Sequence, residues 1–292
     1  LVSVVDFAQL AAALSRFHPA KISLLVAWFT FAYLMLGLRL RFLCLGRLGL
    51  LAGFEASAMC MFLNTILPAR VGEPAKAWFI HKRSGLSLAG SLGAVFWERF
   101  ADLNIFLLLL LAALYSVGVK TAIAPALLAV CGIWAALWCI RHHPALVHRL
   151  IRALPWERFK LFVSELVMHL EQRLGARFGL NLTCLTVLVW AQYMGQILLT
   201  ILWVAQLDVT VGQALVVFVL ASTGIAVPTT PGGIGVYEAI FVFSLGMFGV
   251  AREEALATAL VVRAAQLIPT LTIGGLAMAR SQFKLSQVGR KL

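Results

Sequence analysis

The stretch Asn64–Lys76 interrupts a strongly apolar part of the chain with residues that a soluble protein would place in a surface turn. Pro68 and Gly72 break a helix, and Arg70 and Glu73 lie three residues apart at the break. Irregular backbone and charges are tolerated at membrane depth only where protein or a water-filled cavity surrounds them. The break therefore predicts a polar cavity inside a membrane protein.

A second break of the same kind lies far down the chain, at residues 228–238. A proline and glycine cluster interrupts the helix there, and it consists of Pro231, Gly232, Gly233 and Gly235. Such a turn lets the backbone approach a ligand closely, with bare amides able to bind an anion, although one glycine-rich turn is weak evidence for a phosphate site. We interpret the protein as built on this pair of breaks.

The composition is that of a polytopic membrane protein. Of the 292 residues, 62% are hydrophobic and 12% are charged, whereas a soluble domain is about half apolar and about a quarter charged. No polar linker divides the chain, so a single transmembrane domain over residues 1–292 is expected. The chain starts at Leu1 rather than Met, and this leaves open whether a further helix precedes it.

The net charge of +12 does not indicate a nucleic-acid partner here, because membrane proteins keep basic residues on cytoplasmic loops. The five cysteines are scattered and form no C-x-x-C pair, so neither a disulfide framework nor a metal site is expected. No Walker motif, zinc pattern or Ser-His-Asp order is present. We therefore expect no cofactor and no catalytic residue.

Apolar segments alternate with short charged turns along the chain. After a short interfacial helix within residues 1–21, the expected spans are 22–38, 87–119, 121–140, 180–204 and 255–279. Re-entrant hairpins are expected at 50–80 and 211–250. Residues 141–178 carry seven Lys or Arg and an apolar helical face, so this segment is expected to lie on the inner membrane surface.

Charge fixes the expected orientation of this path. Of the 24 Lys and Arg, 17 fall on segments placed in the cytoplasm and four on segments placed outside. By the positive-inside rule the C-terminus is cytoplasmic. The path also predicts two units of opposite orientation, 22–119 and 180–279, linked by the helix 121–140 and the segment 141–178. The expected fold class is an all-α polytopic membrane protein, an inverted repeat with two re-entrant helical hairpins of opposite orientation.

Two charged groups of residues are expected to face each other across one polar pocket. Arg70 and Glu73 either form a buried ion pair that pins the hairpin, or contribute to a site where Arg70 meets a phosphate or carboxylate. Glu98 and Asp102 lie four residues apart and share a helix face, and Arg99 lies three residues before Asp102. They either join that pocket or are solvated at the cytoplasmic end of their span.

Two further charges follow the second break. Glu238 is expected to cap the returning helix, or to belong to the site. Arg263 lies deep in the last span and needs a partner, for which Glu238 and Glu55 are the candidates.

Three motifs resemble one known family. They are LNTILPARVGEPAK at 63–76, SLGAVFWERFAD at 91–102 and PGGIGVYE at 231–238. Together they are similar to the lysylphosphatidylglycerol synthase transmembrane-region family, over about residues 22–280. The family patterns fall on Pro68, Arg70, Gly72 and Glu73, on Glu98, Arg99 and Asp102, and on Pro231, Gly232, Gly233, Gly235 and Glu238.

The resemblance implies a lipid transporter or flippase of the bacterial inner (plasma) membrane, with membrane lipids as substrate. The compound moved is expected to be an aminoacylated phospholipid, a hopanoid or another lipid-linked molecule. Synthase activity is not implied, because no polar stretch is long enough for a synthase domain. Two alternatives stay open: a membrane-embedded lipid-modifying enzyme with paired carboxylates, and a non-transporting partner subunit of a lipid-synthesis enzyme.

Overall fold

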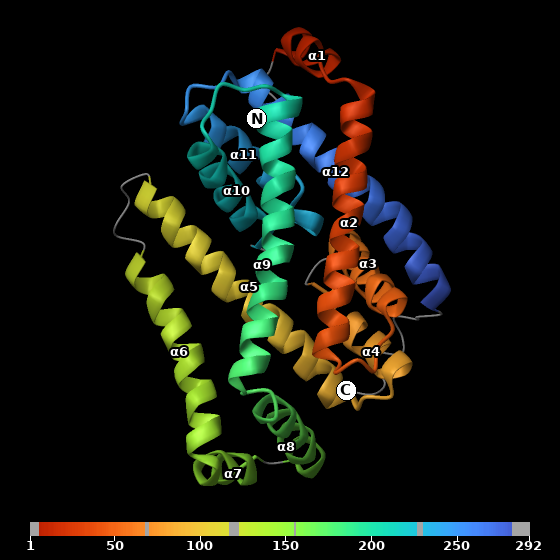
Figure 1. The fold of residues 1–292 in the computed structure, drawn as a ribbon, viewed down its shortest axis with the longest axis vertical. Coiled ribbons are helices and arrows are strands. Elements are labelled where there is room, and N and C mark those ends of the chain that lie inside the picture. Colours follow the sequence, from red (N-terminus) through yellow and green to blue (C-terminus); the bar gives the residue numbers. More distant parts are fainter. Residues whose placement is uncertain (1–5, 68–69, 117–122, 155, 227–229, 282–292) are drawn as a thin grey trace.

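The computed structural model describes residues 6–67, 70–116, 123–154, 156–226 and 230–281, and every regular element in these ranges is a helix (Figure 1). The helices are α1 (Phe7–Ser15), α2 (Pro19–Leu43), α3 (Leu50–Ile66), α4 (Gly72–Ser84), α5 (Leu88–Ser116), α6 (Ile123–His142), α7 (Pro144–Arg152), α8 (Glu157–Glu171), α9 (Ala176–Leu198), α10 (Val211–Ala226), α11 (Val236–Gly246) and α12 (Arg252–Ser281), with a π-helical turn η2 (Leu199–Val204) and a 3-10 turn η3 (Pro231–Gly233). The predicted all-α class is confirmed.

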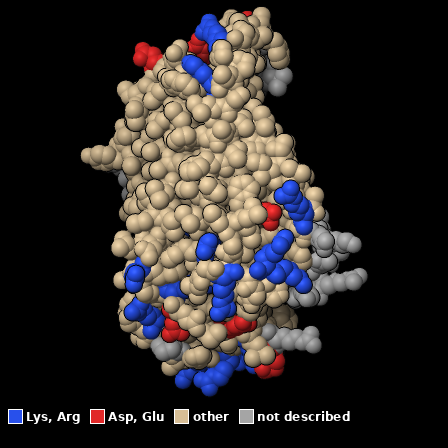
Figure 2. Space-filling model, turned by 45° about the vertical axis from the view of Figure 1, so that its right-hand side comes forward, with Lys and Arg blue, Asp and Glu red and all other residues tan. Residues whose placement is uncertain are grey.

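Four helices are long and apolar enough to cross a membrane. They are Pro19–Leu43, Leu88–Ser116, Ala176–Val204 and Arg252–Ser281, and they coincide with four of the five predicted spans. The fifth predicted span, 121–140, falls on α6, and the predicted turn at Lys120 lies outside the described residues. On the face shown in Figure 2, charged side chains lie at the upper end and over the lower half of the molecule, with an uncharged band between them. The chain is a multi-pass membrane protein.

The first break folds as predicted into a helical hairpin, α3–α4. The backbone is extended at Leu67, where α3 ends, and Arg70 takes a positive φ of 52°. Asn64 then joins the two helices: its Oδ1 accepts from the Gly72 amide at 2.8 Å, and its Nδ2 donates to Glu73 Oε2 at 2.8 Å. One asparagine thus fixes the angle of the turn. Pro68, predicted to break this helix, lies outside the described residues.

The second break also forms a hairpin, α10–α11. Gly232, Gly233 and Gly235 all have positive φ, which glycine adopts without the strain of a side chain. Glu238 Oε2 accepts from the Gly235 amide at 2.6 Å, so Glu238 caps α11. The capping role predicted for this carboxylate is therefore present. Residues 227–229 of the predicted break lie outside the described residues.

The two hairpins enter from opposite ends of the molecule and meet at their tips (Figure 1). A Cβ placed on Gly232 would lie only 3.1 Å from the Thr65 carbonyl oxygen, so the two turns are in van der Waals contact. Along the chain, each hairpin is preceded and followed by a long helix. These helices are α2 and α5 for the first hairpin, and α9 and α12 for the second. The same order of elements thus occurs twice in the chain.

Glycines bring three helices close together around α3. A Cβ on Gly53 of α3 would lie 2.6 Å from the Gly37 carbonyl oxygen of α2, and a Cβ on Gly274 of α12 would lie 2.7 Å from the Ala58 carbonyl oxygen. Small residues at such crossings let backbones approach in a membrane, where apolar side chains gain little by leaving lipid. The hairpin α3–α4 is therefore held from both sides.

The segment 141–178, predicted to lie on the inner membrane surface, folds as more than one helix. It is divided into α7, α8 and the first turn of α9. Part of its apolar face, including the buried Leu170, packs against protein rather than lipid: a Cβ on Gly93 of α5 would meet Leu166 at 3.8 Å. Glycines on α5 allow this approach, which the hydrophobic period of α8 alone could not reveal.

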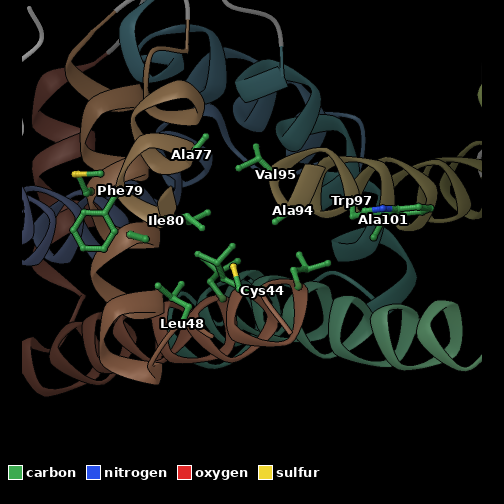
Figure 3. Close-up of a cluster of buried hydrophobic side chains, with 14 of the residues drawn as sticks. Cys44, Leu48, Ala77, Phe79, Ile80, Ala94, Val95, Trp97 and Ala101 are labelled. Carbon is green, nitrogen blue, oxygen red and sulfur yellow. The ribbon is translucent and has the colours of Figure 1, made fainter. Parts of the chain in front are cut away.

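A cluster of buried apolar residues closes the end of the molecule at which α4 lies. Figure 3 shows the turn residues Cys44 and Leu48 with Ile80 of α4 and Ala94 of α5, all members of one core. Burial raises the pKa of the Cys44 thiol to about 12. This turn is part of the packed interior.

Cys44 is expected to resist thiol reagents, because at pH 8 its thiol stays protonated and enclosed. N-ethylmaleimide, with labelling read by peptide mass spectrometry, should label Cys44 far more after denaturation than in the folded protein. Equal labelling of Cys44 before and after denaturation would contradict this packing.

Replacement of Gly53 by alanine should destabilise the protein by about 1–3 kcal/mol, because the added methyl group overlaps the Gly37 carbonyl. Thermal unfolding in detergent measures the effect. Gly132→Ala is the matched control, since nothing lies within 4 Å of its added Cβ and alanine favours helix by up to about 1 kcal/mol. Equal melting temperatures for the two variants would contradict the close crossing.

Candidate functional site

A cavity of about 580 Å³ lies where the two hairpin tips meet. Helices from both halves of the chain line it, together with the glycine turn at Gly232 and Gly233. Its charged lining residues are Arg39, Arg70, Glu73, Lys76, Glu98, Arg99, Asp102 and Arg263. The structure thus brings six of the seven predicted site residues to one cavity, and the seventh, Glu238, contacts Arg263. Their role in binding a substrate stays a prediction.

Glu98 is the centre of a buried ionic network. Lys76 Nζ of α4 donates to both of its carboxylate oxygens at 2.9 Å, and Arg39 Nη2 of α2 donates at 3.0 Å. Arg99 Nη2, from the same helix as Glu98, adds a contact of 3.1 Å. Both Glu98 and Lys76 are buried, with 1% and 2% of their surface exposed. One carboxylate therefore ties together three helices.

Asp102, one turn further along α5, receives a second set of donors. Arg39 donates to its two oxygens, at 2.5 Å from Nη1 and 3.2 Å from Nη2. Arg99 Nη1 lies 3.5 Å from Oδ2, and the Trp190 indole of α9 donates to Oδ1 at 3.2 Å. A planar guanidinium such as that of Arg39 can bridge two carboxylates through its several donors, which a lysine cannot do with the same geometry. Asp102 extends the network to α9.

Two central cations of this network were misassigned from the sequence. The 17 basic residues that the sequence places in the cytoplasm include Arg39 and Lys76, yet Arg39 is fully buried and Lys76 nearly so. The predicted end of the first span at residue 38 was too early, because α2 continues to Leu43. Glu98 and Asp102 exceed Arg99 by one negative charge, and from the sequence Arg70 or Arg263 is expected to compensate it. The structure instead brings Arg39 and Lys76 to these carboxylates.

Glu73 and Arg70 line the cavity from the tip of the first hairpin. Glu73 accepts from Asn64 and lies 3.8 Å from Arg99 Nε, so it connects the hairpin tip to α5. The Arg99 side chain is 41% exposed, which leaves part of its guanidinium open to the cavity. Arg70, in its left-handed backbone conformation, is exposed at the same tip. The predicted meeting of the two charged groups across one pocket is what the geometry displays.

Arg263 holds the tip of the second hairpin. Its Nε lies 3.4 Å from Glu238 Oε1, its Nη2 donates to the Gly232 carbonyl, and its guanidinium lies 5.2 Å from the centre of the Tyr237 ring. Of the two predicted partners Glu238 is in contact, whereas no ion pair among the described residues involves Glu55. The arginine fixes the glycine turn at the cavity wall.

The charges of the network compensate one another. The cations Arg39, Lys76 and Arg99 lie against the anions Glu73, Glu98 and Asp102, and Arg263 lies against Glu238. An isolated charge costs several kcal/mol to bury, and pairing offsets that cost. Within the described part of the chain, no group of three or more His, Cys, Asp and Glu has the arrangement of a metal site.

Glu98→Gln should destabilise the protein by about 3–5 kcal/mol, because three cations lose their shared counter-charge in a buried site. Thermal unfolding in detergent measures the loss. Glu157→Gln, which removes an exposed carboxylate paired with Lys160, is the control and should cost at most about 1 kcal/mol.

The double variant Glu98→Gln with Lys76→Met restores the charge balance and should recover part of the stability lost in the single variant. If the stability losses of Glu98→Gln and Lys76→Met simply add up in the double variant, the two side chains do not interact.

Comparison with known proteins places these features in a family. Residues 1–274 match the family model of the lysylphosphatidylglycerol synthase TM region. No curated protein and no solved structure matches the chain significantly. The match covers the two hairpins, the cavity and the ionic network.

Proposed function

The chain belongs to the lysylphosphatidylglycerol synthase TM-region family, and from this membership and its cavity we propose that it is a lipid transporter or flippase of the bacterial inner membrane. The observation that carries the proposal is the charged cavity at the meeting point of two hairpins. Charged side chains and irregular backbone within the membrane-spanning part of a protein mark substrate pathways.

We propose that both hairpins are re-entrant. At 1.5 Å per residue, α4 and α11, with 13 and 11 residues, extend roughly 20 Å and 17 Å, short of the hydrocarbon core of about 30 Å. Each hairpin therefore turns back inside the membrane, and the backbone of each turn is shielded by the cavity walls. The opposite directions of the hairpins and the repeated order of elements support an inverted repeat.

The orientation we propose puts the end that carries α4, α7 and α8 in the cytoplasm, together with the C-terminus. The basic residues Lys82, Arg83, Arg149 and Arg152 lie on these helices, in keeping with the positive-inside rule. Removing Arg39 and Lys76 from the loop charges leaves the excess of basic residues on this side. On the other side, Arg16 of the first loop pairs with Glu254 at the start of α12.

In this mechanism the substrate headgroup enters the cavity while its acyl chains stay in lipid. Arg70 and Arg99 offer donors to a headgroup phosphate, since Arg70 is exposed at the hairpin tip and Arg99 is partly open. Arg263 and Glu238 hold the opposing tip, and Glu73, Glu98 and Asp102 balance the charge. Relative rocking of the two units would expose the headgroup site to one side and then to the other.

We favour transport over a lipid-modifying reaction because the carboxylates are already engaged. A general base must reach the proton it removes, yet both oxygens of Glu98 accept from Lys76 and both oxygens of Asp102 accept from Arg39. Association with a lipid-synthesis enzyme is compatible with either role, and we propose it only as a supply route for the substrate.

Arg70→Gln should lower lipid translocation in proteoliposomes about tenfold or more, because a charged hydrogen bond to the phosphate contributes about 1.5–3 kcal/mol. Inner-membrane lipid extract supplies the substrates, and headgroup exposure on the two leaflets is measured by chemical labelling. Arg47→Gln removes an exposed arginine away from the cavity and is the control.

Translocation unchanged in Arg70→Gln would remove Arg70 from the site. A chemically altered lipid, rather than a displaced one, would favour the enzyme. No movement of any lipid by the unmodified protein would contradict transport altogether.

A further inference from the structure

The cavity carries a net positive charge. Among the described residues that line it, five are cationic and three are anionic, and they are Arg39, Arg70, Lys76, Arg99 and Arg263 against Glu73, Glu98 and Asp102. Glu238 compensates Arg263 from outside the lining. With Glu238 included, the formal charge of the whole group is therefore one unit positive.

The carboxylates of the cavity have little left to offer a cationic ligand. Glu98 accepts from three cations and Asp102 from two cations and an indole. Glu73 accepts from Asn64 and faces Arg99. An ammonium group entering this cavity would have to displace a buried cation from its partner, which is strongly unfavourable. A phosphate would instead meet guanidinium donors.

A second, uncharged polar wall faces the cavity. Gln196 of α9 lines it together with Gln266 and Thr270 of α12 and Ser222 of α10. Gln196 is 1% exposed, and its Nε2 has no acceptor among the described residues. A buried amide donor without an acceptor is costly, unless a ligand oxygen satisfies it in another state of the protein.

The uncharged wall is separated from the ionic network by a distance that suits a headgroup. Trp190, which donates to Asp102, precedes Gln196 by six residues on α9, which is roughly 9 Å along the helix axis. A headgroup phosphate at the charged end would leave its substituent near Gln196. The cavity thus has one place for an anion and one for neutral oxygen atoms.

We infer that the substrate headgroup is a net anion: a phosphate diester whose other substituent is uncharged and carries hydroxyl or carbonyl oxygens. The inference rests on the proposed function and names its substrate class. Phosphatidylglycerol has this chemistry. An aminoacylated lipid such as lysylphosphatidylglycerol, which is a net cation, does not, although the family bears its name. The phosphate binds at Arg70 and Arg99, and the neutral substituent accepts from Gln196.

Binding by the intact, detergent-purified chain tests this selectivity directly. Native mass spectrometry would measure competition between equal amounts of phosphatidylglycerol, phosphatidic acid and lysylphosphatidylglycerol. We expect phosphatidylglycerol to occupy at least tenfold more protein than lysylphosphatidylglycerol. It should also exceed phosphatidic acid, which has the phosphate but lacks the headgroup glycerol. Equal or preferred binding of lysylphosphatidylglycerol would overturn the inference.

Two variants locate the two parts of the site. Arg70→Glu turns the net charge of the cavity negative and should lower the ratio of bound phosphatidylglycerol to lysylphosphatidylglycerol at least tenfold. Arg47→Glu, with the same charge change at an exposed site off the cavity, should leave it unchanged. Gln196→Leu should abolish the preference for phosphatidylglycerol over phosphatidic acid without changing the discrimination against lysylphosphatidylglycerol. Ratios unchanged in both cavity variants would overturn the assignment.

Two further measurements separate this inference from the proposed function. Soluble glycerol 3-phosphate that displaces phosphatidylglycerol at equal concentration would show a site for free phosphates rather than lipids, and would overturn the lipid assignment. Translocation is then measured in proteoliposomes. Selective binding of phosphatidylglycerol without movement would contradict transport but support the substrate class. Movement of lysylphosphatidylglycerol in preference to phosphatidylglycerol would support transport and overturn the substrate class.

Discussion

The pairing of Glu98 with three cations is the interaction on which the rest of the structure depends. Lys76 comes from the first hairpin, Arg39 from the helix before it, and Arg99 from the helix after it. None of these helices could bury its charge alone, since an unpaired ion inside a membrane protein costs several kcal/mol. The network therefore fixes the hairpin between its flanking helices, beside a polar cavity.

The second hairpin lines the cavity with the backbone of its glycine turn rather than with charged side chains of its own. Glycines allow its turn to contact Thr65, and Arg263 holds that turn through Glu238 and the Gly232 carbonyl. One side of the cavity is thus lined by the ion pairs around Glu98, and the other side is a glycine turn held by Arg263. A cavity formed where two broken helices meet is a common plan for transporters, because either side can open while the other stays closed.

Much of this arrangement could be predicted from the sequence. Proline and glycine between apolar segments predicted both breaks, and the charged residues Glu98, Arg99 and Asp102 predicted a shared pocket. Arg39 and Lys76 were missed because each stands at the end of an apolar run, where a basic residue ordinarily marks the cytoplasmic border. Whether such a residue turns inward depends on tertiary contacts: Asn64 sets the angle of α4, and glycine crossings set the approach of α2. Neither leaves a periodic signal in the sequence.

The most direct measurement of the central claim is an electron cryo-microscopy map of the protein in nanodiscs containing phosphatidylglycerol. A headgroup that binds as proposed should appear between the hairpin tips, with its phosphate near Arg70 and Arg99 and its glycerol near Gln196. Lipid density confined to the outer surface of the helices, with none between the tips, would contradict the account. The cavity would then be only the space beside a structural ionic network.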